Sequence, residues 1–199
     1  GGDGSLSLGP ASGDEAGADE YDYDPHDPVM SLMRADSQAA PVDQSPHDHR
    51  KDILVYDFPV LETELELTGP VLLKLWAQTN GLDTDWTAKL VDVSPTGYAK
   101  NLCDGIIRAR YRQGFDKAVL LEAGAVYEYE IKVGVTSNVF KKGHRIRLEV
   151  SSSNFPRYDR NLNTGGDLYS ETDMRVARQA VFHSAEYPSQ LILPVIPGG

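Results

Sequence analysis

The sequence lacks the short motifs that identify several common enzyme classes. It has no Gly-x-Ser-x-Gly, the strained turn that exposes the serine nucleophile of α/β-hydrolases. It also has no phosphate-binding loop and no His-Glu-x-x-His zinc motif. None of the five histidines stands at a recognisable spacing from a nucleophile. We therefore predict no catalytic residue, no metal ligand and no cofactor, and keep a triad assembled only in space as the minor alternative.

Cysteine and long apolar runs are also scarce. The chain has one cysteine, Cys103, in 199 residues, which excludes an internal disulfide and fits a reducing compartment. No apolar run reaches the ~20 residues of a membrane-spanning helix, so we expect no membrane partner. No signal peptide is visible, and we expect a cytoplasmic location. Because the chain starts at Gly1 without Met, we also expect it to be a processed or truncated piece of a longer protein.

Basic residues are outnumbered, and the imbalance lies at the start of the chain. The formal net charge is −11, and residues 1–57 hold 13 acidic and three basic residues, so that −10 of the charge is there. An acidic chain repels phosphates, which disfavours a nucleic-acid partner. We interpret residues 1–50, dense in Gly, Asp, Ser and Pro, as an irregular acidic segment that wraps the domain or a partner domain. Residues 51–199 are expected to form the folded domain.

The rest of the chain is built of short alternating segments. Its 18 glycines and 12 prolines favour strands and turns over long helices. Seven to nine strands at this spacing predict an all-β fold, specifically a jelly-roll β-sandwich. Residues of one parity in the alternating strands predict the core, which comprises Leu65, Leu67, Leu73, Leu75, Leu90, Ile131, Ile146, Leu148 and Val150.

One aromatic side chain falls on the opposite, half-polar face of its strand. In VLLKLWAQ, Trp76 shares a face with Lys74 and Gln78. It is an isolated exposed aromatic, part of a second core, or part of a site completed by a partner. The alternation leaves these three interpretations open.

Two charged groups could form ion sites. Asp22, Asp24 and Asp27 offer carboxylates to a cation such as Ca²⁺, but the Gly and Glu of a calcium loop are missing. The pattern favours an acidic turn stiffened by Pro25 and Pro28.

The other group is Arg108, Arg110 and Arg112, which share one face of an expected strand. An anion site is one interpretation. The favoured one is a solvated face, paired across strands with acids such as Glu128 or Glu130.

Three stretches carry a resemblance to a known family. They are YDYDPHDPV, DTDWTAKLVDVSPTGYAKNLCDGIIRARYR and TSNVFKKGHRIRLEVSSSNFPRYDRNLNTGG. Through them nearly the whole chain resembles the C-terminal domain of the cocaine esterase and X-Pro dipeptidyl-peptidase family of serine hydrolases. The family implies an α/β-hydrolase domain with a Ser-His-Asp triad, a helical cap and a galactose-binding-like jelly roll. Only the jelly roll is present here, so the resemblance carries over no catalytic residue.

The resemblance also implies a function and partners. It gives Leu75 and Trp76 as residues on the acyl side of the substrate pocket. The expected function is a non-catalytic domain that braces the hydrolase domain of the same parent chain, which itself takes a small ester or amide. A homodimer is a further expected partner. The alternative is a free-standing module that binds carbohydrate or another ligand, with Trp76 or Trp86 stacking on a sugar.

Overall fold

The computed structural model describes residues 3–9, 17–32 and 41–197, which form strands and two single-turn 3₁₀ helices. The strands are β1 (Asp3–Ser5), β2 (Ala18–Tyr23), β3 (Leu54–Asp57), β4 (Leu65–Thr79), β5 (Asp85–Val93), β6 (Ala99–Arg108), β7 (Val126–Phe140), β8 (Arg145–Ser151), β9 (Ala177–Phe182) and β10 (Gln190–Ile192). The 3₁₀ turns are η1 (Ser45–His47) and η2 (Ala109–Tyr111). The described part of the chain contains no helix long and apolar enough to cross a membrane.

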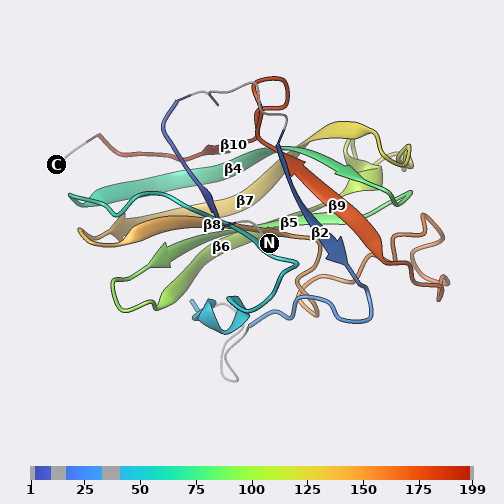
Figure 1. The fold of residues 1–199 in the computed structure, drawn as a ribbon, viewed down its shortest axis with the longest axis horizontal. Coiled ribbons are helices and arrows are strands. Elements are labelled where there is room, and N and C mark those ends of the chain that lie inside the picture. The colour runs from blue at the N-terminus through green and yellow to red at the C-terminus, as the bar shows by residue number, and fades with distance from the viewer. Residues whose placement is uncertain (1–2, 10–16, 33–40, 198–199) are drawn as a thin grey trace.

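The strands form two packed sheets with jelly-roll topology (Figure 1). The first sheet has the order β3-β8-β5-β6, with β1 added in parallel beside β3. In the second sheet β2 pairs with β9, β9 with β4, and β4 with β7. The eight strands from β2 to β9 thus follow the double Greek key of a jelly roll, and the predicted fold class is confirmed.

The core lies between the sheets, as the alternation predicts. Val71, Leu73, Leu75 and Ala77 of β4 are each at most 1% exposed. Eight of the nine predicted core residues are buried, and Leu65 is partly buried against the same cluster. The period-2 pattern is a local property of each strand, which is why it identifies this core so well.

The prediction that residues 1–50 are irregular is wrong at β1 and β2. β2 pairs with β9 along its whole length, and its Tyr21 and Tyr23 are 6% and 0% exposed within the core. In the sequence these tyrosines alternate with acids, a half-buried strand pattern that the acidic composition obscured. Parts of the predicted segment, residues 10–16 and 33–40, lie outside the described residues.

Residues 41–53 cover the outer face of the first sheet. The backbone of this segment bonds to β6, where Gln44 N donates to Ala99 O at 2.8 Å. The Gln44 side chain accepts a hydrogen bond from Lys89 Nζ on β5, also at 2.8 Å. As a result, every residue of β5 is buried, on both faces of the strand.

The two ends of the sandwich differ. The connections 80–84, 109–125 and 152–176 meet at one end, toward the right of Figure 1, which we call the loop end, and residues 24–32 after β2 join them there. The connections 58–64, 94–98 and 141–144 lie at the other, which we call the turn end. The strand registers fix this arrangement, since the end of β4 lies beside the start of β7 and the end of β5 beside the start of β8.

Candidate functional site

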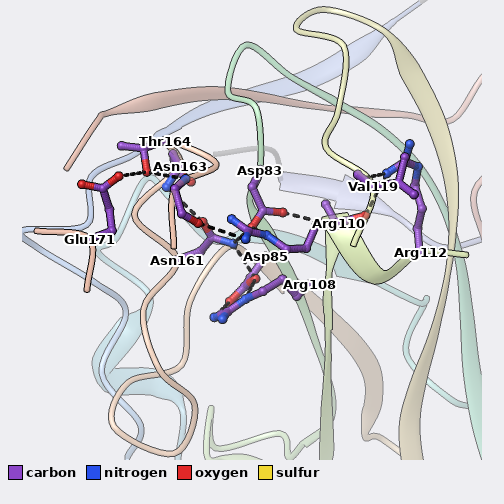
Figure 2. A network of polar contacts seen from close by, with 12 residues as sticks. Asp83, Asp85, Arg108, Arg110, Arg112, Val119, Asn161, Asn163, Thr164 and Glu171 are labelled. Carbon is purple, nitrogen blue, oxygen red and sulfur yellow. Dashed lines mark hydrogen bonds and ion pairs between the residues drawn. The ribbon is translucent and has the colours of Figure 1, made fainter. Parts of the chain in front are cut away.

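The loop end contains a network of buried charges (Figure 2). Asp83, in the connection before β5, and Asp85, the first residue of β5, are 0% and 1% exposed. Arg108 is the last residue of β6, and Arg110 lies in η2. Buried carboxylates of this kind are tolerated only where donors satisfy them, so their partners decide what the site does.

Asp83 is fully engaged by its neighbours. One carboxylate oxygen accepts the backbone N–H of Arg110 at 2.9 Å. The other accepts Arg110 Nε at 2.7 Å and Asn161 Nδ2 at 2.8 Å. The carboxylate therefore holds both the main chain and the side chain of Arg110, and it reaches the connection between β8 and β9 as well.

Asp85 forms a two-pronged pair with Arg108. Nε and Nη2 of the guanidinium each donate to a different carboxylate oxygen at 2.9 Å. Asn161 Nδ2 also donates to Asp85 at 2.9 Å, so one amide bridges the two aspartates. Burial raises the pKa of Asp85 while Arg108 opposes that rise, and the hydrogen bonds to Asp85 raise the pKa of Arg108.

The network continues into the connection between β8 and β9. Asn161 Oδ1 accepts the backbone N–H of Asn163 at 2.9 Å, and Asn163 Nδ2 donates to Arg175 O at 2.7 Å. Arg110 Nη1 donates to Gly166 O at 3.0 Å. The charged groups form hydrogen bonds with one another and with the backbone. The arrangement therefore fixes three connections relative to each other, and it contains no free nucleophile.

The favoured interpretation of the three arginines is confirmed in part: Arg108 pairs across the strands with an acid, Asp85 of β5, but the three side chains do not form a solvated face. Arg108 and Arg110 pair with Asp85 and Asp83 rather than with Glu128 or Glu130. Arg112 donates to Val119 O at 2.6 Å, and its guanidinium carbon lies 4.4 Å from the centre of the Tyr127 ring. The strand ends at Arg108 and a 3₁₀ turn follows, so the parity of a continuing strand does not apply beyond it.

The pairing of Asp85 with Arg108 could in principle be predicted from the sequence, but a one-residue shift in register hides it. Asp85 faces Arg108 because β5 and β6 form a hairpin about the turn at residues 94–98. A bulge after Leu90 shifts the register by one residue, and counting back from the turn without it misses this pair.

The structure separates the two residues of the expected substrate pocket. Leu75 is 1% exposed inside the sandwich, so its side chain has no surface to offer a ligand. Trp76 points outward and is half-buried, its ring 5.4 Å from that of Tyr187. The backbone N–H of Trp76 donates to Ser189 Oγ at 2.9 Å. The chain covers this indole in part and does not enclose it, and its role in a pocket stays a prediction.

The structure contradicts the expectation that Trp86 could stack on a sugar. Trp86 is 0% exposed and packs in the core, with its ring 5.9 Å from Tyr129. Stacking on a sugar requires an accessible ring face, so Trp86 cannot serve this purpose.

Two of the three aspartates near residue 24, Asp24 and Asp27, have separate partners. Asp24 accepts the backbone N–H of His26 at 2.9 Å, and this bond is the main cause of its lowered pKa. Asp27 lies 3.3 Å from a guanidinium nitrogen of Arg50. In residues 3–9, 17–32 and 41–197, no group of three or more His, Cys, Asp or Glu side chains could hold a metal ion. The arrangement fits the interpretation of this segment as an acidic turn.

Three histidines have a ring nitrogen within 3.5 Å of an oxygen atom of another residue. His144 Nδ1 lies 2.7 Å from Asp92, and His183 Nε2 lies 3.5 Å from Asp19. His47 Nε2 lies 2.7 Å from Met30 O. Within the described residues, none of these rings bonds to a Ser, Thr or Cys side chain that it could activate as a nucleophile.

The fold is that of a jelly-roll domain. The buried charges at its loop end bond to one another and hold the connections there in place. Residues 1–192 match the family described as the X-Pro dipeptidyl-peptidase C-terminal non-catalytic domain. The chain belongs to this family, as the resemblance in its sequence indicated.

Its relatives are longer hydrolases. Cocaine esterase from Rhodococcus sp. (strain MB1 Bresler) is 47% identical over 201 residues, which cover 98% of this chain and 35% of that protein. An aminopeptidase from a marine sediment archaeon, Thaumarchaeota archaeon, matches 94% of this chain and 34% of its own with a TM-score of 0.87 at 34% identity. An α-amino acid ester hydrolase matches 97% of this chain and 35% of its own with a TM-score of 0.85 at 31% identity. This chain spans about a third of the length of these relatives.

Proposed function

We propose that this domain braces the catalytic domain of a serine hydrolase that cleaves small esters or amides. The observation that carries the proposal is that nearly the whole chain, 98% of it, matches only 35% of cocaine esterase. The domain is therefore similar to one part of a longer enzyme. The names of the relatives include two ester-cleaving enzymes and an aminopeptidase. Such a domain serves different substrates by stabilising the catalytic part rather than by taking part in the bond cleavage.

The loop end supports a bracing role. Buried ion pairs and amides hold its connections in one arrangement before any partner arrives. A surface that is already ordered loses little conformational freedom on association, and more of its contact energy then stabilises the complex.

The proposal is tested on the parent polypeptide that carries this domain. We expect the full polypeptide to hydrolyse a nitrophenyl ester or an amino-acid amide, and the chain of residues 1–199 alone to show no turnover. Deletion of the domain should lower the thermal midpoint of the catalytic part, and adding the domain back as a separate chain should restore it. Turnover by the chain alone that a serine-directed phosphonate abolishes would refute the proposal.

We further propose that Trp76 contributes to the acyl side of the substrate pocket. Its half-buried indole on the outer face of β4, three residues before the loop end, supports this role. In the parent polypeptide, Trp76→Ala should reduce kcat/KM for aromatic acyl substrates more than for acetyl substrates. An equal effect on both, with unchanged folding, would assign Trp76 to packing against Tyr187 alone.

A further inference from the structure

Building on the proposed function, we infer that the catalytic domain docks on the loop end of the sandwich. The contact surface is a set of exposed apolar side chains from three different connections, which we call the loop-end patch. It comprises Leu82, Phe115, Leu120, Leu168 and Tyr169.

The members of the loop-end patch are exposed, and two of them, Leu82 and Leu120, lie close together. Phe115 and Tyr169 are 89% and 97% exposed, and the three leucines are between 38% and 44% exposed. Leu82 and Leu120 meet over Gly165, where an added Cβ would lie 2.9 Å from Leu82 Cβ and 3.3 Å from Leu120 Cδ2. Exposed apolar side chains at one end of a domain, contributed by segments distant in sequence, are typical of a protein interface.

The backbone beneath the loop-end patch is held in place. Arg110 donates to Gly166 O, and Arg112 Nη1 donates to Val119 O next to Leu120. The Asp167 carboxylate accepts the backbone N–H of Tyr169 at 3.0 Å. The buried charge network of Figure 2 therefore supports the patch from below, and docking would not have to order these connections.

The path of the chain leads to the same end. β1 runs parallel to β3, with Asp3 beside Val55, and β3 starts at the loop end because Leu54 pairs with Val150 near the end of β8. The N-terminal end of β1 therefore points toward the loop end. The matched family is described as C-terminal, so the catalytic part of a relative precedes this domain and joins it from that side.

Other surfaces fit the catalytic domain less well. The outer face of the first sheet is covered by residues 41–53 of this chain. The outer face of the second sheet carries exposed Val135 and Val139 on β7, at 75% and 44%. These valines pair across the sheet with Pro70 and Glu66, in the half of β4 nearer the turn end. They provide a matched control, because they are exposed and apolar but lie away from the entry point.

The test uses the parent polypeptide with a protease site introduced between the two domains. After cleavage, the affinity of the two pieces is measured for the unsubstituted protein, for Phe115→Ser with Tyr169→Ser, and for Val135→Ser with Val139→Ser. Loss of two anchoring aromatics should weaken association by about tenfold or more, while the valine pair should leave it unchanged. The thermal midpoint of each isolated domain confirms that it folds, which is expected because both aromatic side chains are almost fully exposed.

The outcomes separate the two proposals. If the unsubstituted pieces do not associate, the bracing function and the docking surface both fail. If they associate and only the valine variant weakens them, the catalytic domain docks on the second sheet and the present inference is wrong. Association that neither variant alters also overturns it.

Discussion

The interior of the sandwich and the charge network at the loop end are both buried, but different interactions stabilise them. Between the sheets the buried side chains are apolar, and removing part of one costs free energy roughly in proportion to the cavity left. At the loop end the buried groups are carboxylates, guanidiniums and amides that depend on one another. Removal of one partner there leaves an uncompensated charge. The core should therefore tolerate small changes, and the buried charge network at the loop end should not.

A substitution in the charge network of the loop end should cause the largest loss of stability. Asp83→Ala leaves the buried Arg110 without its carboxylate and should lower the free energy of unfolding by about 3–5 kcal/mol. Urea denaturation followed by circular dichroism measures the change. Asp116→Ala, at an exposed position in the connection that follows η2, is the control and should stay within about 0.5 kcal/mol.

A double-mutant cycle sharpens this prediction. Combining Asp83→Ala with Arg110→Ala should cost clearly less than the sum of the two single losses, because the second change removes the stranded charge. Strict additivity would mean that the two side chains stabilise the fold independently, contrary to the network described above.

In the interior, Leu148→Ala should lower the free energy of unfolding by about 2–5 kcal/mol. Leu148 is 4% exposed on β8 and belongs to the main apolar cluster. The same denaturation experiment measures the loss, and a conservative Leu148→Met should retain most of the stability. An unchanged midpoint for the alanine variant would remove Leu148 from the core.

The close approach of β6 and β7 at Gly105 tests packing in the other direction. An added Cβ on Gly105 of β6 would lie 2.1 Å from Lys132 O of β7. Gly105→Ala should therefore force the two strands apart and cost about 1–3 kcal/mol. Wild-type stability of this variant would show that the two edges separate freely.

The smallest expected effect depends on pH. His47 is 8% exposed, and burial lowers its pKa, although its contact with Met30 O opposes the shift. A histidine with a lowered native pKa is protonated more readily in the unfolded chain, so stability falls as pH drops below about 6.5 toward the native pKa. Denaturation between pH 7.5 and pH 5.5 should show this decline, and His47→Gln should reduce its slope. Identical slopes for both proteins would exclude His47 as a cause.

The sequence predicts features that depend on neighbouring residues better than features that depend on residues far apart in the chain. The parity of Leu73, Leu75 and Leu148 is readable within single strands, and the sandwich was predicted from it. Tyr21 and Tyr23 carry the same alternation, but the acidic residues around them give the segment the composition of a solvated loop. The family of the domain is indicated by the resemblance of three long stretches of sequence, which the alternation within single strands does not reveal.

The candidate site was harder to predict because its contacts are distant. Asp83 meets Arg110 across 27 residues and Asn161 across 78. Those pairings depend on the hairpin register and on a bulge whose position the residue types do not announce. The burial of Trp86 likewise follows from the covering of both faces of β5, which single-strand parity cannot show.

One edge of β4 is shared by two strands, β9 beside Trp76–Thr79 and β10 beside Leu72–Lys74. The three residues of β10 thus occupy main-chain donors and acceptors that would otherwise lie open in the middle of the second sheet. An open edge of this kind is a template for a strand from another molecule. Loss of residues 190–192 would therefore change the behaviour of the protein in concentrated solution, from a dispersed domain toward intermolecular sheet growth, before it changed the fold itself.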